Sequence, residues 1–409
     1  MGEKHKAEPA SNIENRLQTI RMARGLSQTE LARSAGITRQ AVCAIEANRY
    51  LPTTAVALRL AGALGCRVED LFSLLTIGEH IEGDLVGSIP LHASHAGQAR
   101  VKVARIGTRF VIRPVSALGE ILNFTVPADG LLIGPAGGER RTVKPGSRVT
   151  VRLLRDRRGV EQEVAVAGCD PAIVLAGEYL RRHHHAATVV GWTMGSAAAL
   201  EALKRGEVHM AGLHIVDAKS GESNLPYLRR HLTGEDVMVV TFAIWEEGLL
   251  VRSGNPKGIR NIGDLAREDV TLMNREGGAG ARLLLDQKLA ATGIDPAQVN
   301  GYRHVARSHF EVARTVAEGR ADVGIGIRAA ARYYGLDFIP LQEARYDLVV
   351  PKAVIASHPT LSVLLDTIVS RPFRTEVEAL GGYDTRETGT VRSLRGSRVV
   401  HAKSRKEEG

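Results

Sequence analysis

The chain has 409 residues, of which 44% are hydrophobic, so it is long enough for two or three domains with separate cores. No run approaches the roughly eighteen apolar residues of a membrane-spanning helix, and the polar start MGEKHKAEPASNIE lacks the apolar core of a signal peptide. We therefore expect a cytoplasmic protein without membrane contact, and the net charge of +9 favours a polyanionic partner. Cys43, Cys66 and Cys169 lie far apart, a spacing that suggests neither disulfides nor a metal site.

After a start at 1–11 that we expect to be disordered, residues 26–49 predict two short helices joined by a tight turn. Ser27 can cap the first helix, and Glu30, three positions later, completes the capping-box pattern. Gly36 provides a residue that adopts positive φ without strain, which the turn between the helices needs.

The second of these helices has the pattern of a DNA-reading helix. Thr38 can cap it, and the apolar residues Val42 and Ile45 sit three apart on one face. Its other face carries Arg39, Gln40 and Cys43. A buried stripe that fixes orientation, with long polar side chains opposite, suits contact with base edges in the major groove. An αα-hairpin used only for packing is the alternative.

Residues 12–72 resemble the Cro-repressor-like (Xre) helix-turn-helix family. The likeness is carried by NRLQTIRMARG, SQTELA, GITRQAV, IEANRYLPT and ALRLAGALGCRVEDLF. The resemblance implies a phosphate contact from Gln28, base contacts from Thr38, Arg39, Gln40 and Cys43, and phosphate contacts from Asn48 and Arg49. We expect Glu46 to be an ion-pair partner of Arg21 or Arg24.

Residues 98–163 change to a period of two in ARVKVARI, RFVIRPV and SRVTVRLL, which predicts a β-rich segment after a linker at 76–97. The segment is expected to form a partial barrel or a sheet annexed to the next domain. Residues 98–160 carry thirteen basic and four acidic residues, a balance of +9. That excess fits either non-specific attraction to phosphate or a solvated arginine-rich surface.

From Val164 onwards strands and helices alternate, a pattern typical of parallel sheets with crossover helices. Two long strands are expected in VMVVTFAIWEEGLLVRSG, crossing between two lobes and back. The predicted fold class is multidomain: an all-α helix-turn-helix bundle at 12–75, the small β-rich segment, and a two-lobed α/β domain at 164–390. A basic tail follows at 391–409.

The half at 164–390 resembles the type 2 periplasmic-binding-protein fold, in particular copies fused to helix-turn-helix regulators or to molybdenum-cofactor biosynthesis proteins. The motifs are AGCDPA, GWTMGSAAALEALKRGEVHMAGLHIVD, VRSGNPKGIRNIGDLA, NREGGAGARLLLD and GRADVGIGIRAAARYYGLDFIPL. Without a signal peptide, the resemblance implies an internal sensor of a small ligand.

Ligands of open α/β sheets lie beyond the carboxyl ends of the strands, where three turns stand out here. Two of them begin helices whose unpaired N–H groups can bind an anion. The candidate ligand residues are Asp170, Thr193, Gly195, Ser196, Arg275, Gly278, Ala279, Gly280 and Arg282. Ordinary helix-entry turns are the alternative. Related chains carry Ser and Thr where Ala279 and Ala281 stand here, which counts against an inorganic oxyanion such as molybdate.

The histidines are weaker candidates. His183, His184 and His185 follow one another at a helix end, where adjacent side chains point in different directions, so we predict no metal there. His209 and His214 fit a core or a cleft position equally. No nucleophile–base pair is recognisable in the sequence, so we expect no catalysis, no cofactor and no metal.

These observations predict a one-component transcriptional regulator. A homodimer would bind double-stranded operator DNA, and a small molecule or oxyanion, molybdate or a molybdenum-cofactor precursor first, would control it. One alternative is an enzyme or accessory protein of molybdenum-cofactor metabolism with an appended DNA-binding module. Another is a regulator whose sensor half has lost its ligand and only dimerises.

Overall fold

The computed structural model describes residues 13–74, 78–90, 99–118, 125–133, 142–183, 188–234, 236–394 and 400–401. The chain divides into two compact units, Met1–His80 with Arg152–Arg157, and Ile81–Val151 with Arg158–Gly409. The start expected to be disordered, the adjacent histidines 184–185 and most of the expected basic tail lie outside the described residues.

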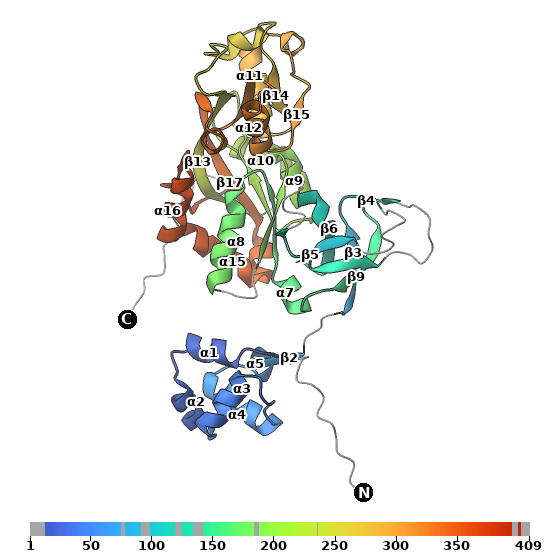
Figure 1. Ribbon diagram of the computed structural model, residues 1–409, viewed down its shortest axis with the longest axis vertical. Helices are drawn as coiled ribbons and strands as arrows, with labels where there is room; N and C mark the ends of the chain where they lie inside the picture. The colour runs from blue at the N-terminus through green and yellow to red at the C-terminus, as the bar shows by residue number, and fades with distance from the viewer. Residues whose placement is uncertain are drawn as a thin grey trace. The chain divides into compact units, whose positions relative to one another are not determined.

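The first unit is a bundle of five helices (Figure 1). They are α1 (Leu17–Ala23), α2 (Gln28–Ala35), α3 (Arg39–Glu46), α4 (Thr54–Leu64) and α5 (Val68–Leu71). Their apolar faces meet in one core, in which Leu17, Leu31 and Leu60 are fully buried. The predicted helical bundle is confirmed.

A two-stranded ribbon that the sequence did not predict joins the ends of this bundle. Strand β1 (Ile13–Asn15) pairs antiparallel with β2 (Phe72–Leu74). Each strand has three residues and its partner lies at the other end of the domain sequence, so no local periodicity signals the pairing.

Five strands close into a barrel in the order β3-β6-β5-β7-β9. Their bounds are β3 (His80–Leu85), β5 (Arg100–Ile106), β6 (Arg109–Pro114), β7 (Gly130–Ile133) and β9 (Arg148–Leu153). A separate pair is formed by β4 (Ile89–Pro90) and β8 (Thr142–Val143). The three runs with alternating residues supply β5, β6 and β9.

Strand β3 lies in 76–97, so the prediction of a linker there is wrong for this stretch. Only Ile81 and Leu85 give its buried face an apolar character, because Gly83 is the third inward position. A Cβ at Gly83 would fall 2.6 Å from the carbonyl oxygen of Phe110, so the close approach of β6 needs glycine there.

Four basic residues of the range 98–160 form ion pairs with acidic residues outside that range. The ion pairs are Arg105–Glu161 and Arg109–Asp84 (each 3.2 Å), Arg148–Glu82 (3.1 Å) and Arg113–Glu207 (2.9 Å). These pairings favour the solvated arginine surface over a patch for phosphate.

The rest of the second unit is built on one sheet whose main path is β11-β10-β12-β17-β13-β16-β14-β15. Its strands are β10 (Val164–Gly168), β11 (Val189–Thr193), β12 (Met210–Leu213), β13 (Val237–Val251), β14 (Leu272–Arg275), β15 (Val305–Ala306), β16 (Val323–Ile327), β17 (Asp337–Pro351), β18 (Tyr383–Asp384), β19 (Thr390–Arg392) and β20 (Val400–His401). The last two form a pair at the edge of β13, inside the range expected to be a loose tail, so that prediction is wrong for residues 391–392 and 400–401.

The helices of this unit cover the sheet. They are α7 (Arg157–Glu161), α8 (Ala172–His183), α9 (Ser196–Lys204), α10 (Leu225–His231), α11 (Gly280–Ala291), α12 (His309–Ala317), α13 (Arg328–Tyr333), α14 (Lys352–Ser357), α15 (Pro359–Val369) and α16 (Arg371–Leu380), with short 3-10 helices at Val115–Leu118, Ile262–Ala266 and Pro296–Gln298. Among the described residues, no helix combines the length and apolarity needed to cross a lipid bilayer.

Two lobes share the long antiparallel strands β13 and β17, each of fifteen residues. Lobe 1 contains β10, β11 and β12 with α8, α9, α15 and α16, and lobe 2 contains β14, β15 and β16 with α11 and α12. Figure 1 shows α11, α12, β14 and β15 gathered at one end of the shared strands and α8 and α15 at the other. The two strands expected within residues 237–254 are therefore one strand, β13, which runs from lobe 1 to lobe 2, and β17 leads the chain back to lobe 1.

Candidate functional site

The turn between α2 and α3 is fixed by three local devices that the sequence predicted. Ser27 Oγ accepts a hydrogen bond from the backbone N–H of Glu30 at 3.2 Å, while the Glu30 carboxylate accepts from the N–H of Ser27 at 2.7 Å. Gly36 ends α2 with a φ of 63°. Thr38 Oγ1 accepts from the N–H of Ala41 at 3.1 Å and so caps α3. The entry angle of α3 is therefore set by short-range bonds.

A buried ion pair holds α3 against the other helices. Arg21 donates to Glu46 from Nε at 2.6 Å and from Nη2 at 3.1 Å, which confirms the expected pairing of Glu46 with one of two arginines. The hydrogen bonds to Glu46 raise the pKa of Arg21. Gln28, the expected phosphate contact, donates from Nε2 to Glu46 at 2.9 Å.

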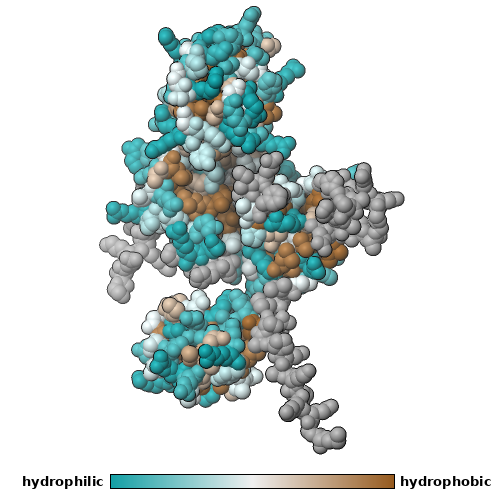
Figure 2. All heavy atoms as spheres, in the orientation of Figure 1, coloured by the Kyte–Doolittle hydropathy of each residue, from teal (hydrophilic) through white to brown (hydrophobic). Residues whose placement is uncertain are grey.

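The solvent face of α3 presents the residues that the sequence assigned to DNA. Val42 and Ile45 are buried in the core of the bundle, and Thr38, Arg39, Gln40 and Cys43 are exposed. Asn48 has a φ of 54° and accepts a hydrogen bond from Asn15 Nδ2 at 2.8 Å, and Arg49 is exposed. Figure 2 shows a mostly hydrophilic surface over this unit.

In the two-lobed domain, the helix-entry turns of the two lobes meet directly. A Cβ at Gly195 would lie 3.0 Å from Ala279 Cα, and a Cβ at Gly280 would lie 2.2 Å from the carbonyl oxygen of His214. The N–H of Ala197 donates to the carbonyl oxygen of Gly278 at 3.2 Å. One donor in the first turn of α9 is thus already used across the lobes.

Two predicted lobe 1 residues lie in the buried region beneath these turns. Ser196 is fully buried, and its Oγ accepts a hydrogen bond from the N–H of His214 at 3.2 Å. Asp170 Oδ1 accepts from the N–H of Ala172 at 2.8 Å and from the hydroxyl of Tyr383 at 3.0 Å. Burial raises the pKa of Asp170 to about 6.

From lobe 2, Arg275 enters the same region and is fully buried at the end of β14. Its Nε and Nη2 each donate to Glu276 at 2.9 Å, and Nη2 also donates to the carbonyl oxygen of Arg307 at 3.2 Å. Its Nη1 is buried without a hydrogen-bond partner among the described residues.

Arg282 contacts this region only through Nη1, which donates to the carbonyl oxygen of Arg275 at 3.3 Å, and Thr193 lies outside it. Arg282 donates to Asp286 at 3.0 Å and lies over the ring of Tyr302 at 4.1 Å, because one helical turn brings Arg282 and Asp286 onto the same face of α11. Thr193, the last residue of β11, is exposed to solvent.

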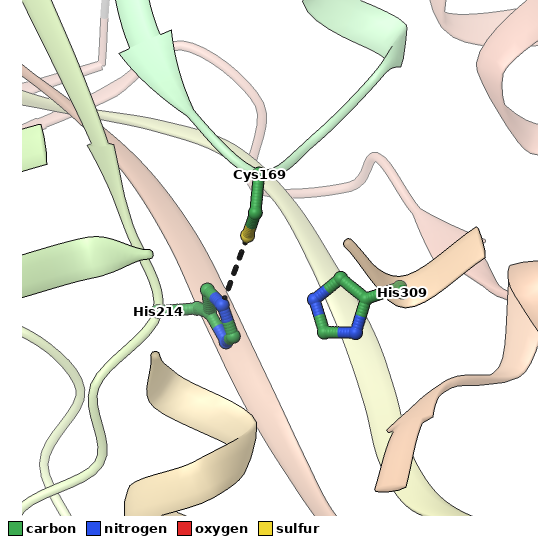
Figure 3. A group of neighbouring side chains, drawn as sticks. All are labelled: Cys169, His214 and His309. Atoms are coloured by element: carbon green, nitrogen blue, oxygen red, sulfur yellow. Dashed lines mark hydrogen bonds between the residues drawn. The ribbon is translucent and has the colours of Figure 1, made fainter. Parts of the chain in front are cut away.

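Four residues that the sequence did not combine meet at the centre of this region. Cys169 Sγ lies 3.1 Å from His214 Nε2, and His214 Nδ1 forms an ion pair with Glu247 Oε1 at 2.7 Å. His309 completes a group in which one donor atom each from Cys169, His214 and His309 lie within 4.8 Å of one another (Figure 3). His214 is thus buried where the two lobes meet.

The pKa values of His214 and His309 are shifted in opposite directions. Burial by itself lowers the pKa of His214, but the neighbouring Cys169 and Glu247 outweigh burial and raise it to about 10. Burial, with the charges of Arg275 and His214, lowers the pKa of His309 well below its usual value.

The sequence does not reveal this group, because Cys169 and His214 are 45 positions apart in the chain. Cys169 and His214 each directly follow a strand, β10 and β12, and His309 opens α12 directly after Ser308, which caps that helix. The rule that ligands lie beyond the carboxyl ends of strands points to the turn at 168–170, which contains Cys169, and to His214, whereas His309 lies in a helix three residues after β15.

Two families match the chain. Residues 17–71 match the family described as "Helix-turn-helix", and residues 177–368 match the "PBP superfamily domain".

Three bacterial proteins are each similar to part of the chain. YvgK of Bacillus subtilis is 39% identical over 197 residues, 48% of this chain and 63% of YvgK, so the chain spans less than two thirds of that relative. A Clostridium pasteurianum protein encoded in the 5′ region of a 2Fe-2S ferredoxin gene is 44% identical over 110 residues, 27% of this chain and 96% of that protein. YgzD of Bacillus subtilis, an HTH-type transcriptional regulator, is 37% identical over 62 residues, 15% of this chain and 94% of YgzD.

Among solved structures, a phosphate ABC transporter substrate-binding protein of Clostridium perfringens with bound phosphate is 13% identical, with a TM-score of 0.42, over 54% of this chain and 98% of that one. The substrate-binding domain of a molybdenum ABC transporter from Clostridium difficile is 15% identical, with a TM-score of 0.36, over 54% and 98%. Together with the family matches, the sequence relatives lead to one conclusion: the chain belongs to the helix-turn-helix transcriptional regulators and carries a PBP superfamily domain C-terminal to its helix-turn-helix domain.

Proposed function

We propose that this regulator binds operator DNA as a homodimer in the cytoplasm and that a small ligand held between the lobes of its PBP-like domain changes its operator affinity. Paired recognition helices of such dimers lie about one DNA turn apart, roughly 34 Å, so an inverted repeat is the expected operator. A ligand that binds the closed lobes better than the open ones shifts the population towards one arrangement of the dimer.

Base reading falls to the exposed end of α3. The caps at Ser27 and Thr38 and the Arg21–Glu46 pair hold this helix, so Arg39 and Gln40 are presented on a rigid support. Long side chains at the start of a recognition helix suit bidentate contact with guanine and adenine edges. Asn48 and Arg49 are assigned to backbone phosphates, which position the domain without reading sequence.

The observation that carries the ligand site is a set of buried polar atoms that lack hydrogen-bond partners among the described residues. The set comprises Arg275 Nη1, Trp245 Nε1, Asp170 Oδ2 and both ring nitrogens of His309. Each such atom costs about 1–3 kcal/mol, so several of them at the junction of two lobes favour a bound molecule that satisfies them.

The first ligands to test are small anions, beginning with molybdate and molybdenum-cofactor precursors. Arg275 Nη1 and the N-termini of α9 and α11 can donate to an anion. Glu276 already neutralises much of the charge of Arg275, and Ala279 and Ala281 supply no hydroxyls, which favours an organic anion with apolar surface over an inorganic one.

The test is thermal unfolding of the full chain with molybdate, tungstate, phosphate and pterins, followed by operator binding with each stabilising compound. Arg275→Gln and Ser196→Ala should weaken binding roughly tenfold to hundredfold, as loss of a hydrogen bond to a charged group does. Arg320→Gln is the matched control, because Arg320 forms an exposed ion pair with Glu318. Ligand and operator should affect each other's binding by roughly 1–3 kcal/mol. If none of the compounds stabilises the protein or alters operator affinity, the assignment of an anion is rejected.

A further inference from the structure

Cys169, His214 and His309 form a compact group of nitrogen and sulfur donors deep in the PBP-like domain (Figure 3). Cys169 is 4% exposed, His214 1% and His309 0%. In a tetrahedral zinc site the sulfur and nitrogen donors lie about 3.5 Å apart, for bond lengths near 2.3 Å to sulfur and 2.05 Å to nitrogen. Here Cys169 Sγ lies 3.1 Å from His214 Nε2, and the donor atoms of all three residues lie within 4.8 Å of one another, so the observed distances span that value. Small side-chain adjustments therefore bring all three donors onto one ion.

His309 is the residue that a packing role does not explain. Both its ring nitrogens are buried and lack hydrogen-bond partners among the described residues. A buried imidazole without partners is costly, and an apolar side chain would fill the same space without that cost. A bound ion supplies the partner that one of these nitrogens lacks.

Glu247 gives the group the support that metal-binding histidines have. Its Oε1 lies 2.7 Å from Nδ1 of His214, while Nε2 of the same ring faces the sulfur of Cys169. A carboxylate on the far nitrogen fixes the tautomer and the orientation of a ligating imidazole. Ser196 adds to this support, since its Oγ accepts from the backbone N–H of His214.

The donors come from both lobes. Cys169 and His214 follow β10 and β12 of lobe 1, and His309 opens α12 of lobe 2. An ion bound by all three therefore favours the closed lobes, which is the differential affinity that a ligand needs to shift a conformational equilibrium.

We propose that Cys169, His214 and His309 bind a divalent transition ion of the zinc type and that this ion is part of the signal which the regulator detects. Thiolate and imidazole suit zinc, cobalt and copper, whereas magnesium and calcium need oxygen donors. Three protein donors leave a fourth position for water or for a donor atom of an organic ligand. The site itself stands on geometry, and its role as a signal rests on the function proposed above.

The pair Cys169–His214 also fits a reactive thiol, as in enzymes with a cysteine nucleophile. That alternative leaves His309 without a role and places the nucleophile where only 4% of it is exposed. The metal site uses every member of the group, so the observations favour it.

The experiment uses full-length protein stripped of metal with a chelator and titrated with Co²⁺, then Zn²⁺. We expect one ion per chain, a charge-transfer band from a thiolate–Co²⁺ bond, and loss of the band when Zn²⁺ displaces cobalt. Cys169→Ser should abolish the band and weaken Zn²⁺ binding roughly a hundredfold or more, and His309→Leu should weaken it similarly. Glu247→Gln should weaken it roughly tenfold to hundredfold, as loss of a supporting carboxylate does.

Two variants serve as matched controls, Cys66→Ser in the DNA-binding unit and His304→Gln on the exposed surface. Both should bind Zn²⁺ as the wild-type chain does. Circular dichroism of the metal-free variants checks their folding, and Cys169→Ser, the smallest change, decides alone if His309→Leu is unfolded. Absence of stoichiometric binding, equal affinity in Cys169→Ser, or rapid alkylation of Cys169 that metal does not slow would each overturn the metal site.

Operator binding, measured with Zn²⁺ and with chelator, separates this proposal from the broader one. A change in affinity that Cys169→Ser removes supports both. If Zn²⁺ does not bind but another compound changes operator affinity, the metal site fails and the regulator stands. If Zn²⁺ binds at the three residues while operator affinity is constant with every compound, the metal's role as a signal is overturned.

Discussion

The backbone N–H of Ala165 donates to Nδ1 of His209 at 3.0 Å, so this ring nitrogen carries no proton. The other nitrogen, Nε2, lies 2.8 Å from the carbonyl oxygen of Arg105 and holds the proton. The neutral ring therefore joins lobe 1 to barrel strand β5 with both nitrogens satisfied. Burial, with the nearby His358, lowers the pKa of His209 to about 3.

This bond predicts a loss of stability at mildly acidic pH. The unfolded chain takes up a proton at His209 near pH 6.5, and the folded chain does so only near pH 3. The stabilisation is thus complete above pH 6.5 and is lost progressively as pH falls towards 3. At pH 5 the loss amounts to about 2 kcal/mol, at 1.36 kcal/mol for each pH unit.

Urea unfolding at pH 7.5 and pH 5 checks this expectation. His209→Gln keeps an acceptor and a donor in place of the ring and should reduce the pH dependence by about that amount. His304→Gln, on the exposed surface, should leave it unchanged. Equal pH dependence in wild-type and His209→Gln protein would show that His209 is not the group that titrates.

The Arg21–Glu46 pair predicts a specific weak point in the DNA-binding unit. Glu46→Gln removes the partner of an arginine whose side chain is only 9% exposed. Breaking a buried pair costs about 3–5 kcal/mol, because the remaining charge stays desolvated. Hydrogen exchange of α1 and α3 should speed up accordingly, with α15 unaffected. Glu69→Gln is the control: its pair with Arg67 is exposed and should contribute less than about 1 kcal/mol.

The exposed end of α3 predicts a loss of specific DNA binding without loss of fold. Arg39→Ala should cost about 1–3 kcal/mol of operator affinity and relax the preference at one base pair, and Gln40→Ala should do so at a neighbouring one. Fluorescence anisotropy with operator variants at fixed salt measures both effects. Arg67→Ala removes an exposed charge elsewhere in the unit and should change binding little. An unchanged base preference in the Arg39 and Gln40 variants would remove them from base reading.

The packing around Gly280 predicts a variant with separated lobes. A Cβ at this position would meet the backbone of His214 at 2.2 Å, so Gly280→Ala should hold α11 away from lobe 1. Small-angle scattering should show a larger radius of gyration that added ligand no longer reduces. Gly277→Ala lies three residues earlier, where a Cβ meets nothing within 4 Å, and should behave as wild-type. Identical scattering from the two variants would contradict the role given to the close contact.

Local signals explain which parts of the fold could be predicted. The caps at Ser27 and Thr38 and the turn at Gly36 depend on residues only three or four positions apart, so α2 and α3 were predictable from the sequence. The ribbon β1–β2 depends on pairing between the two ends of the domain. In β3, Gly83 occupies a buried position, so the alternation of apolar and polar residues is interrupted there. Neither carries a local signal.

The buried region between the lobes was predictable in outline only. Strand ends pointed to Asp170, Ser196 and Arg275, and the structure brings all three to the buried region between the lobes. Which side chains meet there depends on how the lobes approach, and sequence spacing does not contain that information. His309 and Cys169, from opposite lobes, were therefore missed as partners.

Glu247 stands where the pairing of β13 with β17 shifts register, between Glu247 and Gly248, and its carboxylate also holds His214. An irregularity in the strand pairing that the lobes share and the contact to His214 thus meet at one residue. A substitution of Glu247 therefore changes the strand β13 and the surroundings of His214 at the same time. The backbone path between the lobes and the position of the His214 ring are coupled through this one side chain, so neither can be changed there without the other.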